Sequence, residues 1–228
     1  MVTYGDSFAI ATGFQKEGIV LVDLAARIAP EIGLRKPRVF TLDTGRLPRE
    51  TYEMMDLVRQ RYGVAVEVVF PEREAVERMV AERGPNLFYG SVDARAMCCR
   101  VRKVEPLERK LRELRAWAAG LRRSQSETRS DIPKIEQAEG RVKINPLADW
   151  SAEQVEEHIC AHGVPVHPLY ARGYASIGCD PCTRAIMPGE DGRAGRWWWE
   201  QNSKKECGIH FNPDGSVRRE NLAAEDAA

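Results

Sequence analysis

The stretch FAIATGFQKEGIVLVDLAARIAPEIG, residues 8–33, joins two apolar segments through a short polar turn. Residues 8–14 form a β-prone run, and residues 18–33 fit a largely buried helix that ends near Gly33. The alternation is repeated downstream, in predicted strands at 37–45 and 64–70 and predicted helices at 48–63 and 72–84. This pattern indicates an α/β fold, in which a parallel sheet carries helices on both faces and binds ligands beyond the carboxyl ends of its strands.

The second half of the chain continues this pattern and then loses it. Its predicted elements are a charged helix at 104–116, strands at 116–121 and 142–147, an arginine-rich loop at 122–134 and a helix at 149–163. Ser151 and Gln154 form a capping box ahead of that last helix. After Gly163 the sequence is irregular, and it ends in an acidic, Ala-rich tail. We expect one domain over residues 1–202 and a mobile C-terminal segment over 203–228.

The composition limits the partners of this protein. The chain has 228 residues, of which 43% are hydrophobic, so it can bury one substantial core. Its formal charge is zero, but residues 95–134 carry twelve Lys or Arg against five Asp or Glu. This local excess predicts a compact anionic partner and no nucleic acid, since a neutral protein lacks a broad positive field. No apolar run of about 18 residues and no signal-peptide pattern occurs, so we expect a cytoplasmic protein without a membrane span.

Four of the six cysteines stand in two pairs, Cys98 with Cys99 in AMCCRVRK and Cys179 with Cys182 in GCDPCTR. Adjacent cysteines are poorly placed for a disulfide, because neighbouring Cα atoms lie about 3.8 Å apart and a bridge needs about 5.5 Å. In a cytosolic protein, two pairs favour a metal centre over a redox-active C-x-x-C or buried thiols. The tight C-C pair favours an iron–sulfur cluster over zinc, whose ligand pairs are usually spaced by two or more residues.

Cys207 lies in KKECGIHF, near the end of the sequence. The two preceding lysines favour a reactive thiolate, whereas Glu206 opposes it. His210 is a further residue that could favour the thiolate. A reactive thiol and an incidental exposed cysteine both fit this pattern.

The turn GFQKEG, residues 13–18, places backbone N–H groups and a helix start directly after the first strand. A phosphate or sulfate can bind there, and Lys16 adds positive charge. The turn is not a Walker loop, since G-x-x-x-x-G-K-[ST] is absent. Loop arginines match the oxygens of phosphate and sulfate with their planar fork. The candidates are Arg122, Arg123, Arg129, Arg193 and Arg196.

Other conspicuous side chains are interpreted as structural. Cys160 lies one position from the apolar stripe of its helix, and we expect a small core residue. Charged residues of the 104–116 helix are expected on a solvated face: Arg109, Lys110 and Arg112. The run Trp197–Trp199 is expected mostly at the edge of an aromatic core.

In combination, CCRVRKVEPL, GCDPCTR, GRAGRWWWE and ECGIH resemble the assimilatory adenosine 5′-phosphosulfate (APS) reductases, the cluster-bearing branch of the phosphoadenylyl-sulfate (PAPS) reductase family. TLDTGRLPRETYE and GLRRSQSETR are similar to the nucleotide-binding segments of that family. The likeness extends from about Phe8 to His210. It implies an adenine nucleotide α-hydrolase-like, Rossmann-like fold with an irregular cluster-binding region.

The resemblance also implies a reaction and its residues. One 4Fe-4S cluster is implied on Cys98, Cys99, Cys179 and Cys182. Cys207 is implied as the nucleophile that attacks the sulfur of APS, releases AMP and forms an S-sulfocysteine. Thioredoxin or a glutaredoxin-like dithiol then releases sulfite and supplies both electrons, so the cluster is not expected to pass any.

The implied substrate-binding residues are Phe14, Gln15, Lys16, Leu42, Asp43, Thr44, Gly45, Lys103, Arg122, Arg123, Arg193 and Arg196. Arg102 and His210 are implied as assisting residues. A homo-oligomer stays open, because the sequence does not reveal the oligomeric state.

Two features depart from the family pattern. Gly13-Phe14 stands where the family usually has Ser-Phe, so a hydroxyl contact to the substrate is missing and backbone N–H groups must compensate. The chain also starts almost directly at its first strand, whereas relatives usually carry further residues there.

Three alternative functions stay open. The substrate could be PAPS, alone or together with APS. An ATP-dependent thiolation enzyme or pyrophosphatase shares the same fold, but its S-G-G-x-D-S loop is absent from GFQKEG. A metal-stapled module could bind RNA through the arginine loop, although the zero net charge argues against it.

Overall fold

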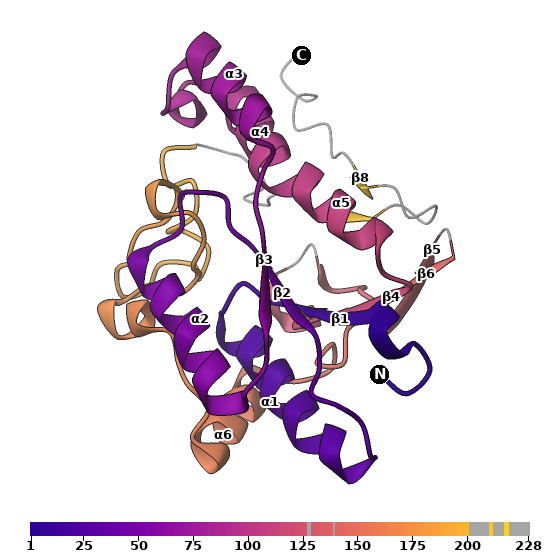
Figure 1. Ribbon diagram of the computed structural model, residues 1–228. Coiled ribbons are helices and arrows are strands. Elements are labelled where there is room, and N and C mark those ends of the chain that lie inside the picture. Colours follow the sequence, from indigo (N-terminus) through magenta and orange to yellow (C-terminus); the bar gives the residue numbers. More distant parts are fainter. Residues whose placement is uncertain (127–128, 139, 201–209, 212–216, 219–228) are drawn as a thin grey trace.

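A six-stranded sheet organises the protein, which a computed structural model describes over residues 1–126, 129–138, 140–200, 210–211 and 217–218 (Figure 1). The spatial order of its strands is β3-β2-β1-β4-β6-β5. Five strands run parallel, and β5 pairs antiparallel with β6 at one edge. The strands are β1 (Phe8–Ala11), β2 (Val39–Leu42), β3 (Val66–Val69), β4 (Ala116–Ala119), β5 (Ile135–Ala138) and β6 (Arg141–Ile144). The pair β7 (His210–Phe211) and β8 (Val217–Arg218) forms a separate antiparallel ribbon.

Helices lie on both faces of the sheet. They are α1 (Lys16–Glu31), α2 (Arg49–Tyr62), α3 (Arg73–Arg83), α4 (Val92–Cys99), α5 (Glu105–Arg112) and α6 (Ala152–His162). In Figure 1, α1, α2 and α6 lie below the sheet and α5 lies above it. The structure thereby confirms the predicted α/β fold with helices on both faces.

The alternation of side chains along the strands explains this two-sided core. Phe8 and Ile10 of β1 pack into the cluster formed with α1, α2 and α6. Ala9 packs on the opposite face, with Leu107 and Leu111 of α5. Successive strand residues point to opposite faces, so a central strand that is buried on both sides reads as a continuous apolar run.

The carboxyl ends of the central strands define where a ligand can bind. The chain leaves β1 and reaches β2 on one side, whereas β4 lies on the other side of β1. The direction of winding therefore reverses between β1 and β4, and open α/β sheets bind ligands in the crevice at such a point. The turns after β1, β2 and β4 meet at this edge.

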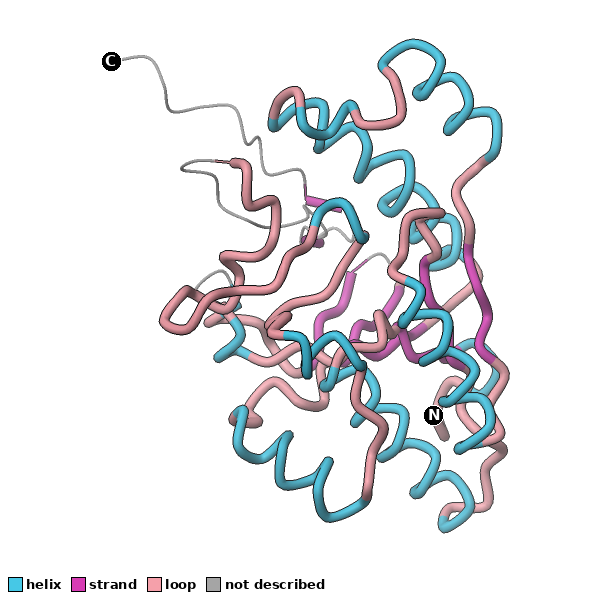
Figure 2. The backbone as a smooth tube through the Cα atoms, turned by 90° about the vertical axis from the view of Figure 1, so that its left-hand side faces the viewer, coloured by secondary structure: helices cyan, strands magenta, loops and turns pink. Residues whose placement is uncertain are grey.

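Residues 163–200 form a mostly irregular segment beside this edge. Figure 2 draws the region largely as loop, and Figure 1 places it next to α2. Asp180 N donates to Arg46 O at 2.8 Å, which fastens the segment to the turn after β2. His167 contributes a second fixed point, because its Nε2 lies 3.1 Å from Thr51 Oγ1 of α2.

Helix ends follow their local sequence. Ser151 and Gln154 form the predicted capping box of α6, with Gln154 N donating to Ser151 Oγ at 3.2 Å. Gly63 ends α2 in the left-handed region at φ 58°, which costs glycine nothing. Both boundaries are confirmed.

Four sequence interpretations need correction. The sheet is not wholly parallel, since β5 is an antiparallel edge strand. The pattern did not indicate α4, an eight-residue helix that contains the Cys98/Cys99 pair. Cys160 is exposed, because one step of 100° turns it away from the buried side chains of α6. Lys110 is buried and ion-paired with Glu67 and Glu113, each at 2.6 Å.

The helices of the described residues include none that is both long enough and apolar enough to span a bilayer.

Candidate functional site

Four cysteines from distant parts of the sequence line one cavity. Cys98 and Cys99 end α4, and the chain continues through a π-helical stretch, Arg100–Val104. Cys179 precedes a 3₁₀ turn, Asp180–Cys182, and Cys182 is the last residue of that turn. The cavity is lined by Thr44, Arg46, Phe88, Arg95, Cys98, Cys99, Arg102, Lys103, Cys179, Pro181 and Cys182. The two predicted cysteine pairs therefore meet.

Local hydrogen bonds hold the GCDPC turn in place. Cys182 N donates to Cys179 O at 2.9 Å, which closes the turn around Pro181. Thr183 Oγ1 donates to Cys179 O at 3.0 Å and accepts from Gly178 N at 3.2 Å. Both cysteines of the motif are thus held by a turn whose backbone groups are paired.

Burial raises the pKa of two of these thiols. Burial raises the pKa of Cys98, and the nearby charge of Arg102 opposes this shift. Burial first, and then the neighbouring Cys179 and Cys99, raise the pKa of Cys182 to about 12. Metal binding requires thiolates, so a metal centre in this cavity has to displace protons from these thiols.

Buried hydrogen-bond donors without acceptors lie at the cavity and in the packing around it. Four buried N–H groups lack any partner among the residues that the structure describes: Arg102 Nε, Arg196 Nε, Trp197 Nε1 and Trp199 Nε1. Arg102 lines the cavity, Trp197 and Trp199 pack in the same cluster as Cys98 and Cys182, and Arg196 lies over the Trp197 ring. Arg102 donates through Nη1 to Thr44 O at 2.7 Å, and Thr44 Oγ1 lies 3.1 Å from Cys179 Sγ. Buried donors are normally paired, so this cluster indicates a missing anionic or sulfur acceptor.

No three His, Cys, Asp or Glu side chains in the described ranges are arranged to hold a single metal ion. Tetrahedral zinc with ligand bonds of about 2.3 Å would need its four sulfurs about 3.8 Å apart. The cavity therefore does not have the arrangement of a preformed zinc site. Each thiolate of an iron–sulfur cluster binds its own iron, so its sulfurs stand further apart than those around one ion.

The turn after β1 is strained and already hydrogen-bonded. Phe14 is fully buried and has a φ of 57°, a rare conformation for a bulky residue. Its N–H donates to Thr12 Oγ1 at 3.0 Å. Gln15 precedes α1 and accepts from Ile177 N at 3.1 Å. The side chain of Lys16 pairs with Glu156 and lies over the ring of Tyr170.

The turn after β2 is organised by Asp43. This buried carboxylate accepts from Gly45 N at 2.7 Å and from the Tyr52 hydroxyl at 3.0 and 3.1 Å. Gly45 needs its freedom here, because its φ is 71°. Leu42 is the half-buried last residue of β2. Thr44 joins this turn to the cysteine cavity.

The predicted arginines separate into two groups. Arg122 Nη2 pairs with Glu17 at 2.9 Å, and Arg123 pairs with Asp149, so both are neutralised at the sheet edge. Arg196 is buried, with its guanidinium carbon 4.8 Å from the ring centre of Trp197. Its backbone forms an isolated β-bridge with Thr183, the residue after Cys182, which places Arg196 beside the cavity, although it is not among the lining residues.

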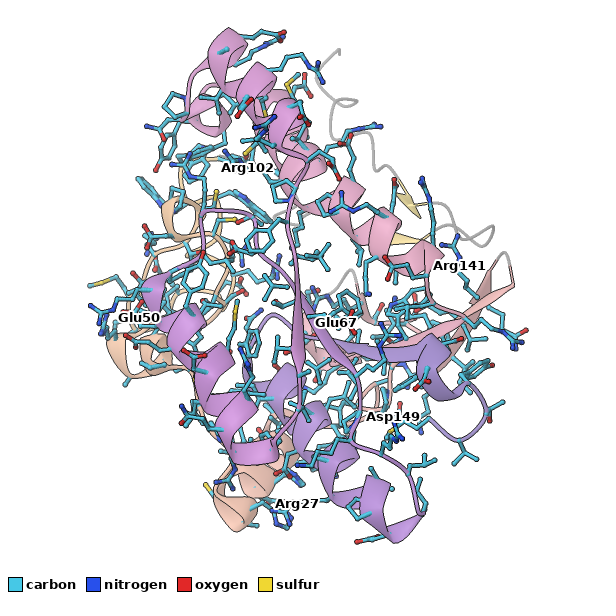
Figure 3. All side chains as sticks on the ribbon, viewed as in Figure 1. Arg27, Glu50, Glu67, Arg102, Arg141 and Asp149 are labelled. Carbon is cyan, nitrogen blue, oxygen red and sulfur yellow. The ribbon has the colours of Figure 1, made fainter. Side chains whose placement is uncertain are left out.

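Arg102 and Lys103 belong to the cavity group as well, since both line the cavity. Figure 3 labels Arg102 near the end of α4. Arg193 is half-buried and its backbone N–H donates to Asp191 Oδ1 at 2.8 Å. Arg129 donates to Gln125 Oε1 at 2.5 Å.

Two predicted residues lie partly or wholly outside the described residues. Cys207 is among residues 201–209, which the structure does not describe. His210 is described only by its backbone, which pairs with Arg218 in the β7–β8 ribbon.

Several site residues were missed in the sequence. Arg95 lines the cavity and forms a buried ion pair with Glu200. Glu17 pairs with Arg122, and Tyr52 holds Asp43. Glu17 lies within the GFQKEG turn. An acidic residue in a turn expected to bind an anion could have indicated that a nearby cation is its partner. Nothing in the local sequence links residues 95 and 200.

The sheet, its winding reversal and the adjoining four-thiol cavity define an adenine nucleotide α-hydrolase-like α/β protein. The chain belongs to the phosphoadenosine phosphosulfate reductase domain family, whose model matches residues 7–185.

Relatives at high identity sharpen this assignment. A Burkholderia cepacia protein named adenosine 5′-phosphosulfate reductase is 56% identical over 175 residues, covering 76% of this chain and 70% of the relative. A protein of the same name from Allochromatium vinosum is 50% identical over 207 residues, covering 90% and 79%.

Solved structures agree with the fold. The crystal structure of a Candida auris phosphoadenylyl-sulfate reductase in a phosphate complex is similar with a TM-score of 0.65 and 27% identity, covering 81% of this chain and 86% of that chain. A Candida glabrata FMN adenylyltransferase complex has a TM-score of 0.57 and 14% identity, covering 97% and 72%, which supports the fold alone.

Proposed function

We propose that this protein reduces APS to sulfite and AMP in sulfate assimilation. The observation that carries the proposal is the meeting of Cys98, Cys99, Cys179 and Cys182 in one cavity beside the ligand-binding edge of the sheet. The high identity to relatives named adenosine 5′-phosphosulfate reductase supports APS as the substrate. The match to the phosphoadenosine phosphosulfate reductase domain favours this proposal over a metal-stapled RNA-binding module.

The residues of the cavity fit one 4Fe-4S cluster held by these four cysteines. The donor set is chemically suitable, and the unpaired Nε–H group of Arg102 in the wall would gain a sulfur acceptor. When bound, the cluster supplies an anionic centre that orients the cations next to it. Arg102 and Lys103, which line the cavity, and Arg196, which lies beside it, would be those cations, and each can also face the sulfate of APS.

The substrate is proposed to bind along the carboxyl edge of the sheet. The turns containing Phe14, Gln15 and Lys16 and containing Leu42, Asp43, Thr44 and Gly45 would hold the nucleotide. Arg122 and Arg123 would approach its phosphate, and Arg193, Arg196 and Lys103 its sulfate. Since Arg122 and Arg123 now face carboxylates, substrate binding has to exchange those partners for phosphate oxygens.

Cys207 is proposed as the nucleophile. Its sulfur forms a bond to the sulfur of APS while the bond from that sulfur to the phosphate oxygen breaks, and AMP leaves with the electron pair. A thiolate of thioredoxin or a glutaredoxin-like protein then attacks Cys207 Sγ and expels sulfite. The second thiol of that protein restores the Cys207 thiol, so two thiols become one disulfide and supply two electrons. His210 is proposed to assist with charge near the thiol.

Chain reach is compatible with this role. Glu200 lies seven residues before Cys207 and is held next to the cavity by Arg95. Seven residues span at most roughly 25 Å. This length of chain is enough for Cys207 to approach the cavity that Arg95 lines.

The decisive experiment is a single turnover without reductant. Purified protein is incubated with APS carrying ³⁵S, and the labelled residue is identified by mass spectrometry. We expect one sulfonate on Cys207 and none in Cys207→Ser, whereas Cys160→Ser, which changes an exposed thiol of α6, transfers normally. Label on any other cysteine would overturn the proposed nucleophile.

The substrate is tested separately with APS and PAPS in steady-state assays with thioredoxin. We expect turnover of APS and much slower turnover of PAPS. Activity with PAPS alone would show that the proposed substrate is wrong while leaving the cysteine chemistry intact.

A further inference from the structure

A fully buried ion pair joins α4 to the last residue described before Cys207. Arg95 Nε donates to Glu200 Oε1 at 2.6 Å, and Arg95 Nη2 donates to Glu200 Oε2 at 3.1 Å. Only 1% of the Arg95 side chain and 3% of the Glu200 side chain are exposed. Two parallel hydrogen bonds fix the direction as well as the separation of the two groups.

Arg95 also contacts the cysteine cavity. It lines the cavity, one turn before Cys99 on the same helix. Its guanidinium carbon lies 4.5 Å from the ring centre of Trp197. One guanidinium thus lines the cavity, lies over an aromatic ring and pairs with Glu200.

Glu200 occupies the point from which the chain leaves the cavity. Its N–H donates to Trp197 O at 2.9 Å, in a turn that follows the strained φ of 41° at Trp197. This turn and the Arg95 pair together fix the position of Glu200, the last residue described before Cys207. Only six residues lie between Glu200 and Cys207, so the place where Glu200 is held limits the space that Cys207 can reach.

Stability alone does not account for such a pair. Desolvation of two buried charges offsets much of their attraction, so hydrophobic side chains of similar size often stabilise a fold equally well. A buried, bidentate pair instead excludes alternative placements of the two elements that it joins. A defined placement is what in-line attack by a thiol on a bound substrate requires.

We propose that Arg95 and Glu200 are positioning residues for sulfonate transfer, which fasten the exit of the Cys207 segment to the helix that carries Cys98 and Cys99. This inference rests on the proposed function. It assigns to the pair a role in the transfer step and none in APS binding. Arg95 and Glu200 touch neither the substrate nor the attacking sulfur in this proposal.

The test compares Glu200→Gln with a matched control, Glu67→Gln. Glu67 also accepts two bonds from one arginine, from Arg38 Nε at 2.8 Å and Nη2 at 3.1 Å, and Figure 3 labels it at the sheet rather than at the cavity. Both substitutions remove one negative charge and keep the shape of the side chain. Four quantities are measured in each variant: iron content, APS dissociation constant, single-turnover sulfonation rate of Cys207, and the rate of limited tryptic cleavage at Lys204 and Lys205.

For Glu200→Gln we expect iron content and APS affinity within about twofold of wild type, sulfonation slowed about 10- to 100-fold, and tryptic cleavage accelerated about fivefold or more. For Glu67→Gln we expect all four quantities within about twofold. Unchanged sulfonation in Glu200→Gln, or an equal loss of APS affinity and sulfonation rate, would overturn the positioning role.

A second variant separates positioning from folding. Replacing both residues, Arg95→Met with Glu200→Met, removes both charges and keeps the site apolar. We expect a melting temperature close to that of wild type with sulfonation still slow, whereas recovery of the wild-type rate would show that the pair serves folding only. Failure of the proposed function itself would appear differently, as absence of Cys207 sulfonation in wild-type protein.

Discussion

At the carboxyl edge of the sheet, charged side chains already have partners within the protein. Lys16 faces Glu156, Arg122 faces Glu17 and Arg123 faces Asp149. In the cysteine cavity, reached from the turn after β2, some buried donors have no acceptor. Arg102 Nε at the wall and Arg196 Nε beside it lack a partner in the described part of the chain, and burial raises the pKa of the Cys98 and Cys182 thiols.

This difference separates two ways of preparing a site for an anion. The edge keeps its cations neutralised and has to exchange partners when a ligand arrives, which limits the gain in affinity from each arginine. In the cavity, the donors are already desolvated when the protein folds. An anionic centre bound there therefore forms hydrogen bonds with them without a further desolvation penalty for the donors. Each region has one non-glycine residue with positive φ, Phe14 at the edge and Trp197 at the cavity.

The largest effect is expected from removing a ligand of the cavity. Cys182→Ser should abolish the iron–sulfur absorption and lower the rate of Cys207 sulfonation about 100-fold or more, because the buried donors then lose their anionic partner. Absorption spectra, iron analysis and single-turnover assays measure this. Cys160→Ser is the control, since that thiol is exposed on α6. Full iron content in Cys182→Ser would show that Cys182 is not a ligand of the metal centre proposed for the cavity.

The next effect concerns a buried cation of the cavity. Arg196→Gln should reduce kcat/KM for APS about 10- to 100-fold, since one charge-assisted hydrogen bond in a desolvated site contributes about 1.5–3 kcal/mol. Arg184→Gln is the matched control, because Arg184 lies in the same irregular segment and is already paired with Glu190 at 2.9 Å. Equal losses of kcat/KM in both variants would mean that the unpaired Nε–H group of Arg196 makes no special contribution to the reaction of APS.

At the edge, packing is tested by Gly120→Ala. A methyl group at Gly120 would lie 2.7 Å from the backbone of Glu17, where α1 begins, so β4 and α1 must separate. We expect the free energy of unfolding to fall by about 2 kcal/mol, measured by urea denaturation. Gly13→Ser should change it by less than about 0.5 kcal/mol, because nothing lies within 4 Å of the added atom. A tolerated Gly120→Ala would mean that the edge is less rigid than its contacts indicate.

The smallest effect tests the exchange of partners. Glu17→Gln releases Arg122 from its carboxylate, so we expect KM for APS to fall about threefold while stability falls by about 1 kcal/mol. Glu156→Gln makes the same change beside Lys16 and serves as a parallel case. An increase in KM in both variants would show that the acids help to hold the substrate.

Much of the regular fold could be predicted from local patterns. Local patterns of neighbouring residues predict the apolar runs of β1, β2 and β4 and the caps of α2 and α6. β5 was missed because IEQA is a polar edge strand, and α4 because VDARAMCC is short and has no clear apolar stripe. Lys110 was expected in solvent because its partner Glu67 lies 43 residues away.

The candidate site divides in the same way. The cysteine pairs and the loop arginines were identified because metal ligands and anion contacts require particular residue types at short spacing. The sequence did not predict which arginines form ion pairs and which keep N–H groups without an acceptor. Arg122 and Arg196 look alike in sequence, yet among the residues that the structure describes only Arg122 is ion-paired with a carboxylate, whereas the Nε of Arg196 has no partner.

By itself, the sequence determined the alternation of strands and helices, the chemical nature of the four thiols and the family to which the chain belongs. The tertiary structure alone decided that those thiols meet beside the turn after β2, and that Arg95 joins Glu200 across 105 residues. The physical reason is the separation along the chain over which each effect acts. Backbone propensity and ligand spacing act over a few residues, whereas burial and charge pairing are fixed by which distant segments the folded chain brings into contact.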